Sequence, residues 1–157
     1  MIPNSCFMFG SRDAAESEYP RICQAVEEAI GDGVRLFIVG RYGHFDGMAR
    51  RAVCQAKRLH PQVRLEILTP YYNCRAGAEP LPPGADGWLY PEGMERVPRQ
   101  YAIVRANRLM AGNVEQVIAG VYHGLGNSAK LLRHVRSISA GRGAPIRIRV
   151  LAQPPEA

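Results

Sequence analysis

Apolar residues follow two patterns along the chain. Short apolar runs predict buried strands at residues 2–9, 36–39, 63–68, 87–91 and 116–122. Apolar residues that recur every three or four positions predict amphipathic helices at residues 20–30, 46–60, 98–110 and 129–138. Residues 145–151 alternate apolar side chains with arginine, which is typical of an edge strand with one solvated face.

Strands and helices therefore alternate along the whole chain. Because parallel strands need crossover segments between them, this order predicts an α/β domain of three layers. Its mostly parallel sheet is expected to carry helices on both faces. The length of 157 residues is typical of one domain, with a core over about residues 5–151. Residues 73–87 contain three prolines and three glycines, so we expect a mobile surface loop there.

The composition limits the classes of function. A formal net charge of +6 suits an anionic partner, such as a nucleotide, a nucleic acid or a membrane surface. No window combines dense Lys or Arg with interleaved aromatic residues, so nucleic acid is the less expected partner. No apolar run has the length of a membrane span and the N-terminus does not resemble a signal peptide, so we expect no membrane partner.

The cysteines indicate neither a metal site nor a disulfide framework. The chain has four of them, with no C-x-x-C pair and no Cys/His spacing that fits zinc. Cys6, Cys23 and Cys54 lie within apolar patterns and are expected to be small buried residues. We therefore expect no bound metal and a reducing, cytoplasmic location.

A glycine-bearing turn follows the predicted strand at residues 36–39. Gly40, Gly43 and Gly47 interrupt the apolar pattern, and Asp46 can cap the helix that comes next. Such a turn directs free backbone N–H groups and the positive end of the helix dipole at one point, which suits a phosphate. A tight turn that binds no ligand explains the same residues equally well.

Two other loops are expected at the same edge of the sheet. Gly10, Ser11 and Arg12 follow the first strand, and residues 124–130 form a second glycine-rich turn into a helix. Because the carboxyl ends of parallel strands share one edge, these loops should meet there. Neither turn carries an intact G-x-G-x-x-G fingerprint or a P-loop lysine pattern, which argues against a standard NAD enzyme and a P-loop ATPase.

Several side chains near this edge have two interpretations. Asp46 is either a helix cap or a contact to a ligand hydroxyl, and His44 is either exposed or a general acid–base group. Arginine side chains can neutralise phosphate or simply lie at the surface, and aromatic side chains can stack on a base or pack in the core. The residues with these open roles are Arg12, Arg99, Arg105, Tyr42, Tyr71, Tyr72 and Trp88.

Four motifs together resemble the SLOG superfamily, which is related to the Smf/DprA and LOG families. They are Phe9-Gly10-Ser11-Arg12, the turn at residues 40–49, Tyr90-Pro91-Glu92-Gly93-Met94-Glu95-Arg96-Val97-Pro98 and Asn107-Arg108-Leu109-Met110. More narrowly, they are similar to its small bacterial and phage-associated branch of YpsA-like proteins. The Gly40-x5-Asp46 spacing is also similar to the glycine turn of the DprA family. The resemblance covers about residues 5–139 and implies a Rossmann-like fold that binds nucleotides or nucleotide-derived ligands.

By position, the resemblance implies ligand contacts at Gly10, Ser11, Arg12, Gly40, Gly43, Phe45, Asp46, Asn107 and Gly126. Their neighbours in the loops complete the predicted phosphate-binding set, namely Arg41, Tyr42, Gly124, Asn127 and Ser128. The chain departs from the family where adjacent Arg-Asn is expected, because Ala106 precedes Asn107 and Arg105 lies one place earlier. It also has Gly126-Asn127-Ser128 in place of the family's G-G-A turn.

Three functions remain open on these residues. The first is a nucleotide-binding domain without strong catalysis, since the Glu that LOG phosphoribohydrolases use is absent, with Leu131 and Leu132 in its region. The second is a nucleoside-phosphate N-glycosidase that uses another carboxylate, with Asp46, Glu92 and Glu95 as candidates. The third is a single-stranded nucleic-acid binder similar to DprA. The expected partner is a small-molecule nucleotide, and a homodimer stays open.

Overall fold

The computed structural model describes residues 1–72 and 79–151. Its centre is one sheet of six strands in the order β4-β3-β2-β1-β5-β6, and all five strand pairings are parallel. The fold class predicted from the alternating pattern is therefore confirmed. The strands are β1 (Ser5–Gly10), β2 (Leu36–Val39), β3 (Arg64–Leu68), β4 (Gly87–Leu89), β5 (Gln116–Gly120) and β6 (Arg147–Val150).

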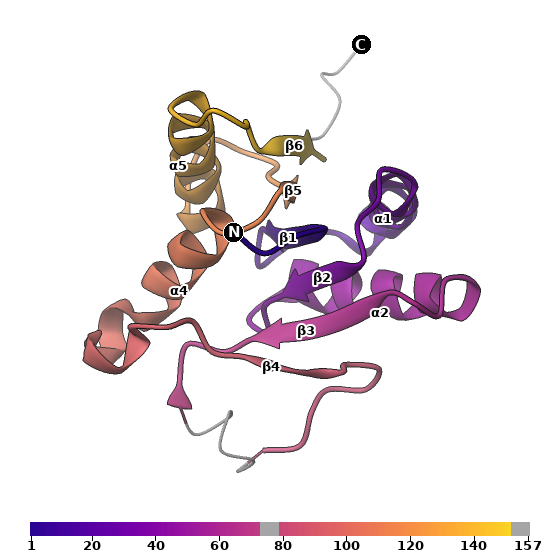
Figure 1. Ribbon diagram of the computed structural model, residues 1–157, viewed down its shortest axis with the longest axis horizontal. Helices are drawn as coiled ribbons and strands as arrows, with labels where there is room; N and C mark the ends of the chain where they lie inside the picture. The colour runs from indigo at the N-terminus through magenta and orange to yellow at the C-terminus, as the bar shows by residue number, and fades with distance from the viewer. Residues whose placement is uncertain (73–78, 152–157) are drawn as a thin grey trace.

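Helices cover both faces of this sheet (Figure 1). One layer contains α1 (Tyr19–Gly31) and α2 (His44–Leu59), and the other contains α4 (Ala102–Ala111) and α5 (Asn127–Ala140). Because successive strand residues point to opposite faces, Met8 packs with the first layer and Phe7 with the second. Each layer of helices thus has its own apolar core, and the two cores share the sheet.

Several element boundaries differ from those predicted. The helix expected from Asp46 begins two residues earlier, at His44, because Gly43 takes the N-cap position with a φ of +136°. Glycine adopts such a positive φ more readily than any other residue. The helix expected from Pro98 opens instead with a 3-10 turn. The apolar pattern does not predict the 3-10 turns of the described residues, which are η1 (Glu16–Glu18), η2 (Met94–Arg96) and η3 (Arg99–Tyr101).

The loop predicted at residues 73–87 lies partly outside the described residues, at 73–78. Its described part, residues 79–86, forms no helix or strand and packs along α2. Arg50 Nη1 donates to the Pro83 carbonyl at 2.9 Å, and Lys57 Nζ lies 2.7 Å from Asp86 Oδ2. The Leu65 N–H also donates to Asp86 Oδ2, at 2.8 Å. This segment is therefore anchored to α2 and β3, and the predicted mobility stays a prediction.

Two of the cysteines expected to be buried are only half-buried. Cys6 lies wholly within the core on β1, as predicted. Cys23 and Cys54 lie on α1 and α2 at the edge of the core, where the apolar stripe of each helix meets solvent. The apolar pattern correctly predicted that both cysteines face the inner side of their helices. It did not predict how deeply they are buried. Cys74 lies outside the described residues.

The strand order creates a switch point beside β1. The chain fills the sheet outward from β1 through β2 and β3, and later returns to place β5 on the other side of β1. The crossovers on the two sides of β1 therefore lie on opposite faces, which leaves a crevice at the carboxyl ends of β1 and β5. Ligands of open α/β sheets bind in such crevices.

Candidate functional site

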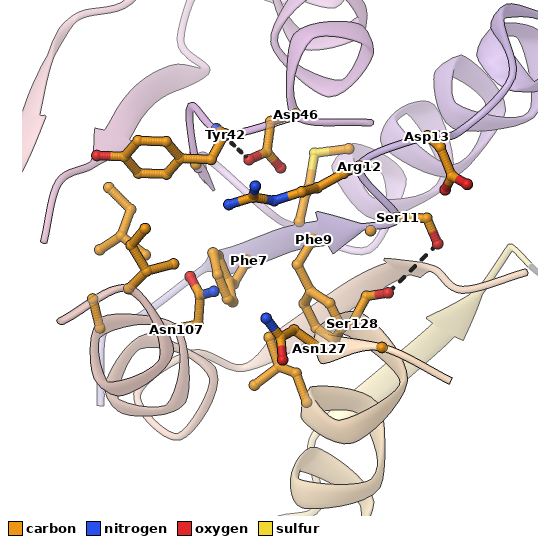
Figure 2. Close-up of a pocket in the computed structure, with 18 of the residues that line it drawn as sticks. Phe7, Phe9, Ser11, Arg12, Asp13, Tyr42, Asp46, Asn107, Asn127 and Ser128 are labelled. Carbon is orange, nitrogen blue, oxygen red and sulfur yellow. Dashed lines mark hydrogen bonds between the residues drawn. The ribbon is translucent and has the colours of Figure 1, made fainter. Parts of the chain in front are cut away.

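A cavity of about 240 Å³ lies at the carboxyl end of β1. Its walls come from the last residues of β1, the turn after β2, one side of α4 and the first turn of α5 (Figure 2). These are the loops and helix ends that the sequence predicted to meet at one edge. The cavity therefore coincides with the switch point of the sheet.

The deep part of the cavity is apolar. Phe7 and Phe9 of β1 form its floor, with ring centroids 5.6 Å apart. Leu68, Ile103 and Leu131 close it from β3, α4 and α5. A flat, apolar group would find contacts on several sides here, as in most small-molecule sites.

The start of α5 presents hydrogen-bond donors to the cavity. Gly126, with a φ of +92°, is the N-cap of α5, and the helix then begins with Asn127 and Ser128. The first N–H groups of a helix have no partner within it, and they lie at the positive end of its dipole. The Ser128 hydroxyl lies 3.5 Å from that of Ser11, which brings the end of β1 against this helix start. This arrangement suits an anion.

Arg12 extends into the cavity, with its guanidinium on the side of Asp46 and Tyr42 (Figure 2). Its backbone is fixed, because the His44 N–H donates to the Arg12 carbonyl at 2.9 Å. A Cβ at Gly43 would lie 2.9 Å from Arg12 Cα, so this close approach requires glycine. Within residues 1–72 and 79–151, the Arg12 guanidinium forms no hydrogen bond or ion pair. Its charge is available to a ligand.

Asp46 places a carboxyl group on the cavity wall facing Arg12. Its Oδ2 accepts the Tyr42 N–H at 3.0 Å, and a Cβ at Gly40 would lie only 2.7 Å from that oxygen. Burial raises the pKa of Asp46 to about 6, although the Tyr42 N–H and the Arg12 charge act to lower it. This pKa lies well above that of an ordinary aspartate.

Phe45 lies in the core beneath the site and does not line the cavity. Its ring occupies the space where side chains of Gly10 and Gly120 would begin, since a Cβ at either position would overlap it. The ring thus fastens the start of α2 beneath the carboxyl ends of β1 and β5. Phe45 therefore supports the site by packing beneath it and does not contact a ligand in the cavity.

The other predicted residues divide between the cavity and its surroundings. Gly10, Ser11, Arg12, Gly40, Tyr42, Asp46, Asn107, Gly126, Asn127 and Ser128 line the cavity. Arg41, Gly43, His44, Phe45, Gly124, Glu92, Glu95, Arg99 and Arg105 do not.

Three of the excluded side chains have other contacts. Arg41 lies over the Trp88 ring, 5.2 Å from its centroid, and pairs with Glu79 at 2.7 Å. Arg99 lies over the Tyr71 ring, at 4.2 Å. His44, a candidate acid–base group, directs Nε2 to Glu16 at 3.0 Å and Nδ1 to the Ala14 carbonyl.

Sequence reasoning did not assign the apolar floor to the site. Phe7, Phe9, Leu68, Ile103 and Leu131 all lie in apolar patterns that predict core positions. Most core residues of such patterns face another side chain, and which of them border a cavity depends on tertiary packing that the local pattern does not show. Asp13 and His123 at the rim were also not singled out.

The described part of the chain shows no group of three or more His, Cys, Asp or Glu side chains arranged for a metal ion. Within those same residues, none of the helices combines the length and the apolar character needed to cross a bilayer.

Comparison with known proteins bears on the fold. No family model matches the chain, and a search of the curated proteins finds no match. Among solved structures, the chain is similar to DNA processing protein A (DprA) from Streptococcus pneumoniae, with a TM-score of 0.59 and 18% sequence identity. The match covers 97% of this chain and 50% of DprA, so the chain spans half the length of that protein. The two share a fold, and it is the Rossmann-like fold that the resemblance implied.

Proposed function

We propose that this chain is a SLOG-type domain of the YpsA-like kind, and that its cavity binds a nucleotide or a nucleotide-derived ligand. One observation carries the proposal. A single cavity joins a helix N-terminus and Arg12, which forms no hydrogen bond or ion pair within residues 1–72 and 79–151, to a floor of aromatic and aliphatic side chains. A phosphate attached to a flat base through a sugar has this same distribution of charge and apolar surface.

The ligand's orientation follows from where the donors of α5 and the aromatic rings of β1 lie in the cavity. The phosphate lies at the start of α5, within reach of Arg12, and the base lies against Phe7 and Phe9. Asp46 lies on the cavity wall facing Arg12, where its carboxyl group can accept a sugar hydroxyl. At about 240 Å³ the cavity lies just below the range of about 300–1,000 Å³ typical of ligand pockets. This size favours one nucleotide unit over a complete dinucleotide.

A thermal-shift screen against nucleoside mono-, di- and triphosphates, nucleotide sugars and dinucleotides tests the proposal. A ligand at one hundred times its dissociation constant stabilises the native state by about 2.7 kcal/mol. The shift should disappear in Arg12→Ala and persist in Arg58→Ala, which removes an exposed arginine from α2 on the other side of the sheet. Absence of a shift with every compound, for wild type at millimolar concentration, would contradict a nucleotide site.

Asp46 supports a second function, hydrolysis of the N-glycosidic bond of a nucleoside phosphate. Among the three carboxylates considered for this role, only Asp46 lines the cavity. A carboxyl group with a pKa near 6 suits general acid–base catalysis at neutral pH. Release of free base from nucleoside monophosphates, followed by chromatography, should then be lost in Asp46→Asn. Glu95→Gln serves as the control and should retain the rate, and an inactive wild type would leave binding as the function.

A further inference from the structure

A second hollow lies along the outward face of α2. Its volume is about 510 Å³, and its walls come from the start of α1, from α2 and from residues 83–84. Among the described residues, none lines both this hollow and the cavity at the carboxyl end of β1. We call it the α2 hollow, and a ligand bound in it would occupy a site separate from the proposed nucleotide site.

The lining of the α2 hollow is basic. Arg50, Arg51 and Arg58 belong to it, and among the described residues no Asp or Glu does so. Like charges close together on one helix repel one another and destabilise it. A bound anion removes that repulsion, so this lining favours a ligand of negative charge.

Arg58 and Arg50 keep hydrogen-bond donors for such a ligand. Within residues 1–72 and 79–151, the Arg58 guanidinium forms no hydrogen bond or ion pair. Arg50 donates from Nη1 to the Pro83 carbonyl at 2.9 Å, and its other guanidinium nitrogens have no partner among those residues. Both side chains can therefore bind an anion without breaking a contact that the fold uses.

Arg51 differs from these two because it is already paired. Its Nη1 lies 2.8 Å from Glu16 Oε1, and its guanidinium lies over the Tyr19 ring, 4.6 Å from the centroid. The Tyr19 hydroxyl donates to Gln55 Oε1 at 2.9 Å, which leaves the NH2 group of this amide as a donor. A ligand therefore meets a donor from Gln55 beside the two available arginines, while Glu16 balances the charge of Arg51.

The wall opposite these arginines is held against α2. Gly84 has a φ of +84°, and a Cβ there would lie 2.2 Å from Cys54 Sγ. Lys57 Nζ donates to the Gly84 carbonyl at 2.9 Å, and the Cys54 thiol lies 3.6 Å from the Pro83 carbonyl. Because these contacts fix the wall before a ligand arrives, binding requires little further ordering of the chain.

The spacing of the two available arginines indicates the shape of the ligand. Arg50 and Arg58 are eight residues apart, about 12 Å along the helix axis at about 1.5 Å per residue. A guanidinium group binds one phosphate or carboxylate through two parallel hydrogen bonds. A small molecule with an anionic group at each end can therefore contact one arginine with each group.

We propose that the α2 hollow binds a small dianion, and that Arg50 and Arg58 each bind one of its two separated phosphate or carboxylate groups. The proposal is independent of the nucleotide site, because neither arginine lines the cavity beside β1.

Calorimetric titration tests the proposal with two pairs of probes, fructose 1,6-bisphosphate with fructose 6-phosphate and glutarate with butyrate. At about 50 mM salt, where screening is weak, one dianion should bind at least tenfold more tightly than its monoanionic counterpart. The pair that shows this difference identifies the bound group as phosphate or carboxylate. Arg58→Gln should weaken binding of that dianion about tenfold, through loss of one charge-assisted contact, and Arg50→Gln should act similarly.

Cys54 reports where the dianion binds. Its thiol lines the α2 hollow, so saturating dianion should slow its alkylation by iodoacetamide at least fivefold, as measured by mass spectrometry of the Cys54 peptide. Two control variants should leave the affinity for the dianion unchanged within twofold. Arg136→Gln removes an exposed charge from α5, and Arg12→Ala removes the guanidinium of the cavity beside β1.

Three results would overturn the proposal. The first is equal affinity for the dianion and the monoanion in both pairs, and the second is dianion binding that is insensitive to Arg58→Gln. The third is dianion binding that is lost in Arg12→Ala while Cys54 is alkylated at its full rate, which would place the anion in the cavity beside β1. A nucleotide screen without a hit would remove the proposed nucleotide site and leave the dianion site standing.

Discussion

At the scale of single residues, the ionised carboxylate of Asp46 lowers the stability of the native state. Its carboxyl group is held by the Tyr42 N–H, yet burial raises its pKa to about 6. The folded chain therefore binds this proton more tightly than the unfolded chain does. As pH rises from about 4 to 6, ionisation of Asp46 lowers the stability of the native state. A group that destabilises the fold is typical of a site kept for function.

Replacement of this carboxyl group should stabilise the protein. Asp46→Asn keeps an oxygen that can accept the Tyr42 N–H but removes the half-buried charge. We expect the variant to exceed wild type in the free energy of unfolding at pH 8, by on the order of 3 kcal/mol at most. At pH 4 the two proteins should be nearly equal, because Asp46 is then protonated. Denaturant titration at both pH values measures this difference.

Asp13→Asn is a suitable control, since Asp13 is exposed at the rim of the same cavity. Exposed substitutions of this kind change stability by about 0.5 kcal/mol or less. A stability difference between wild type and Asp46→Asn that is the same at pH 4 and pH 8 would show that burial does not perturb this carboxyl group.

The sequence predicted part of this arrangement. Asp46 was expected either to cap the helix that follows or to contact a ligand hydroxyl; it is not the cap, because Gly43 takes that position, and Asp46 lies inside α2 and accepts the Tyr42 N–H of the preceding turn. Its place on the cavity wall facing Arg12 could not be predicted, because Arg12 and the end of β1 lie more than thirty residues away in sequence. Interactions within a turn are visible in local sequence, whereas burial comes from tertiary packing.

At the scale of elements, Phe45 is the contact that positions α2 beneath the sheet edge. Gly120→Ala would introduce a Cβ that overlaps the Phe45 ring. Because the ring is enclosed in the core, we expect a loss of about 1–3 kcal/mol, as for other overpacked cores. Thermal or denaturant unfolding measures it.

Gly47→Ala is the matched control, because it lies inside α2 and a Cβ there has no neighbour within 4 Å. Alanine in a helix interior is favoured over glycine by about 1 kcal/mol, so this variant should gain stability. Phe45→Leu combined with Gly120→Ala should recover part of the loss, since the smaller side chain leaves room. A Gly120→Ala protein as stable as wild type would show that α2 is not fastened by this ring.

Elements themselves were predictable where the pattern was strong. The apolar runs of β1, β2 and β5 and the stripes of α1 and α5 fix the type of each element. The alternating arginines of β6 were less informative. Arg147 is exposed as expected, but Arg149 is mostly covered and pairs with Asp32 and Glu28 of the α1 end. Alternation predicts which face a side chain takes, but not whether another element covers that face.

At the scale of the whole molecule, the alternation of strands and helices predicted the layers but not the order of strands. Nothing in the local pattern shows that β5 pairs with β1 while β4 lies at the far edge. That order decides which loops surround the cavity. It also brings together Arg12, Asp46, Asn107 and Ser128, which come from four different segments. The resemblance to a known superfamily supplied many of these residues, while the apolar floor required the structure.

The switch point also has a mechanical consequence. Residues 1–72 contribute β1 and the start of α2 to the cavity, and residues 102–131 contribute α4 and α5. These two parts of the chain are joined through the β1–β5 ladder, from Cys6 opposite Gln116 to Gly10 opposite Gly120. A ligand that filled the cavity would contact both parts and hold them together across that ladder. Force applied to separate them would then be resisted at two places, and the end of the ladder nearest the ligand would be the last to open.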